Sequence, residues 1–489
     1  MKPIFNRGLL MTSGRREDRS GYARRFFEAL ESTGRFYRNS GEGYTVIDPI
    51  GPRRLFTGIE LAASVNNLLD IVRTALDKEG NLVDQTAILR PEEVSLLFGS
   101  DEVQLLRRID AIIPESIVVP SSDGYRRLSP GYDAATETYY YVRAGEPPIE
   151  PLPGVQHLIE CFSGVPFASP EHRANLMAWL LGAVCLDRQM DAPFLVVDGN
   201  QQGVGKSSCV QAGGYILSGT YPQPIDFSGG EFMKQLSSRF LEADRIMFLD
   251  NIVNNAGRSY DNPQLSSLLT QGYSKKIRIL GHSRNVSASG ILFAASVNEA
   301  RLSTDLATRA LIVRLYKERP GPMIPYCKEY AIAHRRELYG ELLWLASQNP
   351  TPVSLDLYEN CRFRRWLEFV ASRIVPHFGH LAIQESYTLD DTVQRLFQFG
   401  AECVADGVAD FDVDFFLAAI SSKQGYIALA EHFNAMNAHG RKVAAGRLLS
   451  RNAGRTVAPI PGEPGITLTK FSGYNQTTPG RYCFTKSAS

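Results

Sequence analysis

The residues best suited to chemistry lie in one short stretch, from Gly199 to Ser208. Glycines such as Gly203 and Gly205 allow backbone N–H groups to turn inward around phosphate oxygens. A helix that opens at Lys206 would add the partial positive charge of its N-terminus. The spacing therefore predicts a phosphate-binding loop, or else an ordinary glycine turn between a strand and a helix. The residues expected to cradle the phosphates are Gly199, Asn200, Gln202, Gly203, Val204, Gly205, Lys206, Ser207 and Ser208.

Two side chains of this loop have distinct expected roles. The Lys206 ammonium would reach the β- and γ-phosphates of ATP, and the Ser207 hydroxyl would ligate Mg²⁺. The motif places a glycine six residues before the lysine, where this chain has Asn200. Either the loop starts one residue earlier, at Gly199, or Asn200 takes the left-handed conformation that glycine usually takes.

A second apolar run, Arg245 to Asp250, ends in a carboxylate that would hold the water shell of Mg²⁺ and be fixed in place by Ser207. The alternative for Asp250 is a plain aspartate at the end of a strand. The next residue, Asn251, can orient a water molecule but cannot accept its proton. The catalytic base therefore lies elsewhere, with Glu231 as the candidate, or hydrolysis is slow.

Two further polar residues follow at element ends. Asn298 ends a third apolar run and would bond the attacking water near the γ-phosphate, unless it merely caps the strand. Arg309 ends a short helix, and its planar guanidinium would suit the γ-phosphate of a neighbouring subunit. An ion pair with Asp305, four residues earlier, is the alternative for Arg309.

Two stretches are candidates for contacts with DNA phosphates. The first is an expected β-hairpin that turns at Gly281-His282; its basic residues either grip a phosphate backbone or point into solvent. Those residues are Lys275, Lys276, Arg278, His282 and Arg284. The second is the segment 416–489, whose nine basic and two acidic residues give a net charge of +7. We expect helices over 427–436 and 442–451 there, followed by strands over 456–460 and 481–485 with a polar loop between them. Helices followed by a β-hairpin suggest a winged helix, with Arg447 and Arg451 on one helix face toward DNA, or else a basic protein–protein module.

The hydrophobic pattern around these residues predicts an α/β protein with several domains. Apolar runs at 194–197, 245–250, 290–298 and 310–315 read as buried parallel strands. The expected division is 1–150, a small α/β domain of unknown role with a basic arm over residues 1–25; 151–345, the P-loop ATPase; 346–415, a helical region; and 416–489, the basic winged-helix-like domain. In the first domain we expect a helix over 58–76.

The order of these motifs resembles a known family. The P-loop is followed by Asp250-Asn251, Arg278-Ile-Leu-Gly281, Ser296-Val-Asn298 and Leu302-Ser-x-Asp-Leu-Ala-x-Arg309. This order resembles superfamily 3 and virulence-associated-E-like ATPases of phage and mobile-element primase-helicase proteins, within the AAA+ group. The resemblance covers residues 110–345. It implies a P-loop AAA+-like parallel sheet, and a ring, usually a hexamer, that moves along DNA using ATP. By position, it also implies that Lys206 and Ser207 bind phosphate and Mg²⁺ and that Asp250 is the Walker B aspartate. Asn298 would be the sensor near the γ-phosphate, and Arg309 would be the arginine finger that reaches a neighbouring subunit.

Composition limits the other possibilities. The 489 residues carry 52 basic and 52 acidic side chains, so overall charge does not indicate a nucleic-acid partner. No run of about 18 apolar residues predicts a membrane span, and the N-terminus lacks the apolar core of a signal peptide. Seven cysteines without a Cys-x-x-Cys pair argue for a reducing cytoplasm and against a disulfide scaffold or a zinc site.

The sequence thus predicts an ATP-dependent DNA helicase or translocase of a phage or mobile element that hydrolyses ATP between the subunits of a ring. A regulatory or assembly AAA+ ATPase, acting in element maintenance or antiphage defence without unwinding DNA, is the alternative, and Asn251 favours it. An initiator that recognises an origin through its C-terminal domain is a third possibility.

Overall fold

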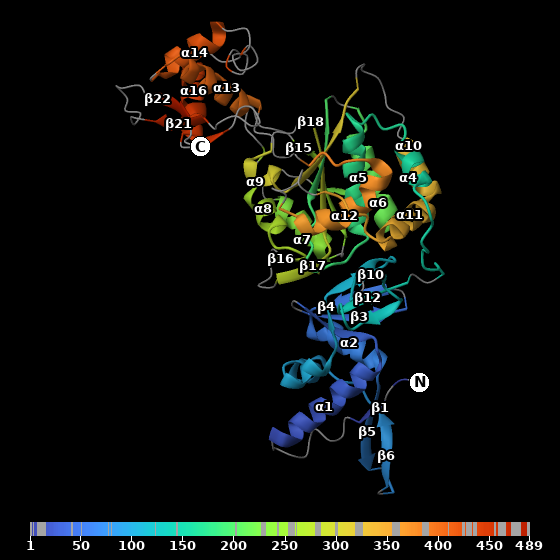
Figure 1. The fold of residues 1–489 in the computed structure, drawn as a ribbon. Helices are drawn as coiled ribbons and strands as arrows, with labels where there is room; N and C mark the ends of the chain where they lie inside the picture. The colour runs from blue at the N-terminus through green and yellow to red at the C-terminus, as the bar shows by residue number, and fades with distance from the viewer. Residues whose placement is uncertain are drawn as a thin grey trace. The chain divides into compact units, whose positions relative to one another are not determined.

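The computed structural model divides into two compact units, Met1–Ser386 and Tyr387–Ser489 (Figure 1). It describes residues 2, 4–6, 16–40, 43–49, 51–76, 78–79, 81–122, 124–142, 145–200, 203–225, 231–241, 244–252, 260, 262–278, 285–298, 302–317, 326–354, 362–383, 391–408, 410–422, 426, 433, 438–453, 456–457, 466–470 and 481–486.

The first unit contains a parallel sheet whose strand order, within the described residues, is β14-β15-β18-β13-β19. The strands are β14 (Pro224–Ile225), β15 (Ile246–Ile252), β18 (Leu292–Asn298), β13 (Phe194–Gly199) and β19 (Ala310–Leu315). Their runs of apolar residues are buried, as expected for parallel strands covered on both faces. The four strands predicted here are confirmed. Because all five described strands are parallel, their carboxyl ends share one edge of the sheet, where ligands of open α/β sheets bind.

Helices cover this sheet. Helix α6 starts directly after the glycine loop and contacts β13 and β18, and α5 packs on β19, where the Asn175 amide donates to the Ile312 carbonyl at 2.8 Å. Further helices surround these two and the edge strands. The bounds are α4 (Gln156–Cys161), α5 (Pro170–Ala183), α6 (Lys206–Ser218), α7 (Glu231–Leu241), α8 (Pro263–Leu269), α9 (Thr304–Ala307), α10 (Tyr326–Ala333), α11 (Arg335–Ser347) and α12 (Arg364–Phe378).

The N-terminal part of the first unit has its own aromatic core, in which Phe26, Phe27 and Phe98 pack edge to face and Phe36 lies tilted against Phe98. Its helices are α1 (Arg16–Ser32), α2 (Gly58–Leu68) and α3 (Pro91–Phe98), with a 3₁₀ turn at Asp101–Leu105. Its strands are β1 (Ile4–Asn6), β2 (Phe36–Asn39), β3 (Tyr44–Asp48), β4 (Gly51–Leu55), β5 (Asp70–Leu76), β6 (Leu82–Thr86), β7 (Arg108–Ile109), β8 (Ala111–Ile113), β9 (Val118–Ser121), β10 (Gly124–Arg127), β11 (Gly131–Asp133) and β12 (Thr138–Tyr140).

Two local predictions are wrong in this part. Residues 16–25 are not an arm: they belong to α1, because Tyr22, Ala23 and the following phenylalanines bury one face of a helix. The helix predicted over 58–76 ends at Leu68, and β5 follows it. Leu69 is already extended, with φ −112° and ψ 144°, and the β-branched residues of β5 favour a strand.

The second unit combines helices with an antiparallel sheet of strand order β20-β21-β22. The bounds are α13 (Asp391–Ala405), α14 (Val413–Ser422), α16 (Ala438–Asn452), β20 (Thr456–Val457), β21 (Ile466–Lys470) and β22 (Tyr482–Lys486). The helix predicted over 442–451 is confirmed as part of α16. Strand β21 was predicted as polar loop, but Ile466 and Leu468 alternate into the core and mark it as a strand.

None of the described helices combines the length and the apolar character that a membrane span requires.

Candidate nucleotide-binding site

The glycine loop joins the carboxyl end of β13 to the first turn of α6. Gly203 and Gly205 have φ values of 79° and 101°, in the left-handed region that favours glycine, and Gly205 is the N-cap of α6. Gly199 is required for a different reason. A Cβ atom on Gly199 would lie 2.4 Å from Val204 Cγ1 and 3.0 Å from Lys206 Cδ. The loop therefore closes tightly over Gly199, with its lysine folded back against the strand end.

Asn200 does not take the left-handed conformation, since among the described non-glycine residues only Glu137 has a positive φ. Instead, the Asn200 amide nitrogen donates to the Lys317 carbonyl at 3.0 Å, and its oxygen accepts from the Lys317 backbone N–H at 3.2 Å. The side chain thus ties the start of the loop to the end of β19. The close approach at Gly199 favours the alternative in which the loop starts one residue earlier.

Three side chains from three elements meet behind the loop. The Ser207 hydroxyl of α6 donates to Asp250 Oδ1 of β15 at 2.8 Å and lies 3.3 Å from Ser296 Oγ of β18. Ser296 also donates to Asp250 Oδ1. The contact between Ser207 and Asp250 was expected from the sequence, whereas the role of Ser296 was not. The signal for Ser296 is its place two residues before the polar end of an apolar run, because side chains two residues apart in a strand point to the same side.

The Lys206 side chain is held close to this cluster and is only 8% exposed. Burial lowers the pKa of its ammonium, while the Asp198 and Asp250 carboxylates oppose that shift. A cation held at the head of a helix, with partial desolvation, is suited to binding phosphate oxygens.

These residues fit a magnesium nucleotide by their donor set. Mg²⁺ in nucleotide sites is typically held through one or two protein oxygens together with phosphate oxygens and water, and Ser207 and Asp250 supply an adjacent hydroxyl and carboxylate. Among the described residues, no group of three or more His, Cys, Asp and Glu side chains is arranged to hold a metal ion by itself.

The other residues predicted for this site are placed less completely. Asn298 ends β18 and pairs in register with Gly199 of β13, so its backbone adjoins the start of the loop. Asn251 follows Asp250 on β15; the side chains of both asparagines, and Gln202 as a whole, lie outside the described residues. Glu231 opens α7, is exposed and forms an ion pair with Lys234 at 2.6 Å.

Arg309 lies at the opposite end of the sheet. The Phe194 backbone N–H, at the amino end of β13, donates to the Arg309 carbonyl at 2.9 Å. The six residues of β13 span about 17 Å, at about 3.3 Å per residue, which is much longer than an arginine side chain. Its guanidinium contacts Asp305 Oδ1 at 2.9 Å, the ion pair anticipated as an alternative. Arg309 thus cannot reach the phosphate site of its own chain.

The basic hairpin is present as β16 (Ser274–Arg278) paired antiparallel with β17 (Asn285–Ser289). The alternation of the strand leaves Lys276 and Arg278 exposed but buries Lys275, which shares the inward face with Ile277. The expectation that Lys275 faces DNA is wrong, because its Nζ donates to the carbonyls of Leu268 and Gly272 at 3.1 and 2.8 Å. Burial lowers the pKa of Lys275 to about 8. His282 and Arg284 lie outside the described residues.

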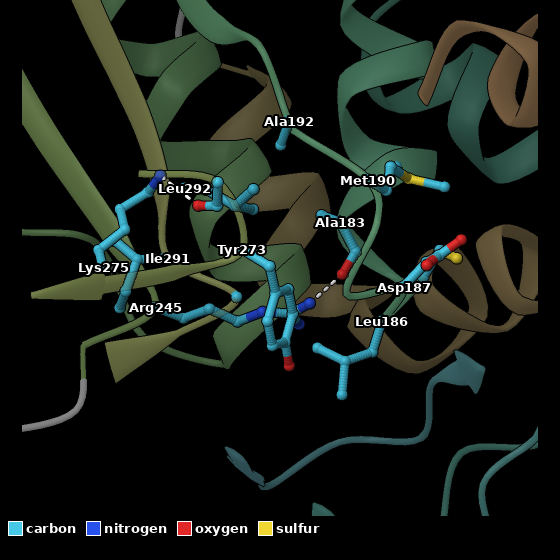
Figure 2. A pocket seen from close by; sticks show the side chains of 14 residues that line it. Ala183, Leu186, Asp187, Met190, Ala192, Arg245, Tyr273, Lys275, Ile291 and Leu292 are labelled. Carbon is cyan, nitrogen blue, oxygen red and sulfur yellow. Dashed lines mark hydrogen bonds between the residues drawn. The ribbon is translucent and has the colours of Figure 1, made fainter. Parts of the chain in front are cut away.

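Lys275 lines a small cavity of about 40 Å³, shown in Figure 2 together with Arg245, Tyr273 and Asp187. Arg245 precedes β15 and Leu292 starts β18, so the cavity lies at the amino ends of the strands. It is separate from the glycine loop, which follows the carboxyl end of β13. Arg245 donates to the Ala183 carbonyl across the cavity wall.

In the second unit, Arg447 and Arg451 lie four residues apart on α16, and their side chains are outside the described part of the chain. Other basic residues here are paired with acidic ones. Lys442 bonds Asp414 at 2.9 Å, and Arg481 bonds Asp410 at 2.8 Å.

Comparison with known proteins adds little to this geometry. No protein-family model and no curated protein match the chain. Among solved structures, the "A form apo structure of NrS-1 C terminal region-CTR" is 12% identical, with a TM-score of 0.42 over 94% of this chain and 98% of the other. "The apo structure of NrS-1 C terminal region (305-718)" gives 11% and 0.39 over 94% and 98%. "SCCmec type IV Cch - active helicase" gives 9% and 0.24 over 83% and 74%. Likenesses with scores this low establish neither fold nor function for this chain.

Proposed function

We propose that this chain is a P-loop ATPase of the AAA+ type that acts as a DNA helicase or translocase of a phage or mobile element. ATP is hydrolysed between the subunits of a ring, with six as the expected number. Lys206 and the loop amides bind the phosphates, and Ser207 and Asp250 hold Mg²⁺, which would neutralise charge on the phosphates. Asn298 and Asn251 orient the attacking water.

The observation that carries this proposal is the 2.8 Å hydrogen bond from Ser207 to Asp250. It joins the first turn of α6 to the end of β15. In the sheet, β18 lies between β15 and β13, the strand that precedes the loop. Two residues 43 positions apart in sequence thus form one potential magnesium site, at the sheet edge where α/β proteins bind ligands.

The proposed nucleic-acid contacts use the exposed face of the hairpin, Lys276 and Arg278, and the helix that carries Arg447 and Arg451. A winged-helix role for the second unit is supported by its helices followed by an antiparallel sheet, and by the net charge of +7 over its residues 416–489.

The first test is the steady-state ATPase rate with and without single-stranded DNA. Wild-type chain should be stimulated by DNA, Lys206→Ala should lose hydrolysis, and Lys276→Gln combined with Arg278→Gln should lose stimulation while keeping the basal rate. Lys234→Gln, which removes an exposed lysine elsewhere, is the matched control. If Lys206→Ala displaces a strand from a forked duplex as fast as wild type does, the helicase assignment is refuted.

A mixing experiment tests the role of Arg309 in trans. Lys206→Ala supplies a normal arginine but a defective loop, and Arg309→Ala the reverse, so each alone should be inactive. In mixed rings, about one quarter of interfaces would be fully normal at equal amounts, because each interface is formed by unlike faces of two subunits. Recovery of ATPase activity on mixing supports the proposal. If activity does not recover at any mixing ratio, Arg309 has no role in trans and serves only in its ion pair with Asp305.

The alternative is a regulatory or assembly ATPase that changes shape without unwinding DNA. Two observations favour it: Asn251 stands where a proton acceptor is expected, and Glu231 is exposed in an ion pair with Lys234. Slow hydrolysis that is indifferent to DNA, with no strand displacement, would establish this second candidate.

A further inference from the structure

Ser296 is the third member of the cluster behind the glycine loop. It lies on β18, which separates the strand before the loop from the strand that carries Asp250. Its side chain is 2% exposed. A hydroxyl buried to this degree needs a hydrogen-bond partner, and Ser296 has Asp250 Oδ1 as an acceptor and Ser207 Oγ at 3.3 Å.

The two serines use the same oxygen of Asp250. Both Ser207 and Ser296 donate to Oδ1. Two bonds from different elements to one oxygen restrict the rotation of the carboxylate and so set its orientation toward the loop helix. Hydrogen bonds to a charged acceptor are stronger than those between neutral groups, so the anchoring is firm.

The distances also define how the proton of Ser207 can be placed. A hydroxyl has one hydrogen and two lone pairs. Since Ser296 donates its own hydrogen to Asp250, its oxygen can accept from Ser207. Ser207 therefore has two acceptors, Asp250 and Ser296, and can keep its proton bonded while a lone pair turns toward a cation.

We infer that Ser296 is a positioning residue for the magnesium nucleotide: it orients the Asp250 carboxylate and the Ser207 hydroxyl without touching the nucleotide. This inference rests on the proposed function. It assigns the metal-dependent part of nucleotide affinity to three residues on α6, β15 and β18, rather than to Ser207 and Asp250 alone.

The test is the dissociation constant of ADP, measured by calorimetry on the full chain in saturating Mg²⁺ and again in EDTA. Ser296→Ala should weaken binding about tenfold to a hundredfold in Mg²⁺, the range for one hydrogen bond to a charged group, and leave the value in EDTA unchanged within about twofold. Ser237→Ala is the matched control. Ser237 is also a buried serine, but its hydroxyl donates to the Met233 carbonyl within α7 at 2.6 Å, so both values should stay the same.

A purely structural role for Ser296 predicts equal losses in Mg²⁺ and in EDTA, and that result would overturn the inference. If wild type binds ADP more tightly in Mg²⁺ than in EDTA, and Ser296→Ala gives the same two dissociation constants, the inference is overturned but the proposed function is not. A wild type that binds no ADP in either condition would refute both. The double variant Ser207→Ala, Ser296→Ala should lose less than the sum of the single losses, because both bonds serve one carboxylate.

Discussion

Replacing Lys275 with methionine should reveal the cost of burying a charge on the inward face of β16. The Lys275 ammonium donates to two carbonyls and lies 5.9 Å from the centre of the Phe293 ring, with Asp191 as the carboxylate that opposes its deprotonation. Burial nevertheless lowers its pKa from 10.5 to about 8. This shift corresponds to roughly 3 kcal/mol, at about 1.4 kcal/mol per pH unit.

The direction in which the free energy of unfolding changes with pH follows from proton binding by Lys275 in the folded and unfolded chain. Below pH 8 the lysine is charged in both the folded and the unfolded chain, and the folded state bears the full cost. Between pH 8 and 10.5 the folded chain releases this proton while the unfolded chain retains it, so the Lys275 contribution to the free energy of unfolding rises with pH. From pH 7 to pH 10, wild type should gain roughly 2–3 kcal/mol relative to Lys275→Met.

Urea unfolding at the two pH values measures this difference. The fluorescence of Trp179, Trp344 and Trp366 reports on the first unit, because all three tryptophans of the chain lie there. The loss of two hydrogen bonds in the variant does not depend on pH and cancels in the comparison. Lys276→Met, on the exposed face, is the control. A difference between wild type and Lys275→Met that stays constant with pH, or falls, would refute the reasoning.

Three further substitutions test close contacts and buried hydrogen bonds in the first unit. Gly199→Ala forces a Cβ within 3.0 Å of Lys206 Cδ; it should weaken ADP binding at least tenfold in a titration, at a stability cost of about 1–3 kcal/mol, and affinity equal to wild type would contradict the close approach. Glu341→Ala removes a buried carboxylate that accepts two backbone N–H groups at the start of α4; it should cost about 1–3 kcal/mol in urea unfolding. Gly182→Ala places a Cβ 2.1 Å from Trp366 Nε1 between α5 and α12; it should destabilise the first unit by about 1–3 kcal/mol and change tryptophan emission, whereas an unchanged spectrum would show that the helices shift freely.

The parts of the fold that could be predicted from sequence are those fixed by neighbouring residues. The apolar strands and the helix that opens at Lys206 follow from contiguous patterns, and each lies where expected. Residues 16–25 were misassigned because their charges suggested solvent, while the aromatic face that holds the helix in place begins only at Tyr22. The end of α2 at Leu68 depends on β5 pairing with β1 and β6, which are distant in sequence or follow a turn.

Lys275 and Ser296 show a different limit. Both positions obey the period of two in a strand: Lys275 lies two residues before the buried Ile277, and Ser296 lies two residues before the strand end at Asn298. The signal was therefore available. A lysine is usually assigned to solvent, and a serine within an apolar run is usually given no role. The role of each buried side chain depends on a partner outside its own strand. Lys275 donates to the Gly272 carbonyl, and Ser296 donates to Asp250.

The arrangement of the sheet separates nucleotide binding from the proposed phosphate contact of Arg309, which the order of the motifs alone does not separate. The residues proposed to hold the magnesium nucleotide, Lys206, Ser207 and Asp250, come from one chain and from one edge of the sheet. Ser296, which is proposed to position them, lies at the same edge. Arg309 lies at the other edge and is bound to Asp305. Nucleotide binding can therefore be complete in a single chain, while any contact of Arg309 with a phosphate requires a second copy. A loss of hydrolysis without a loss of binding is the signature that this separation predicts for Arg309→Ala, because the variant removes a group that its own chain cannot bring to the nucleotide.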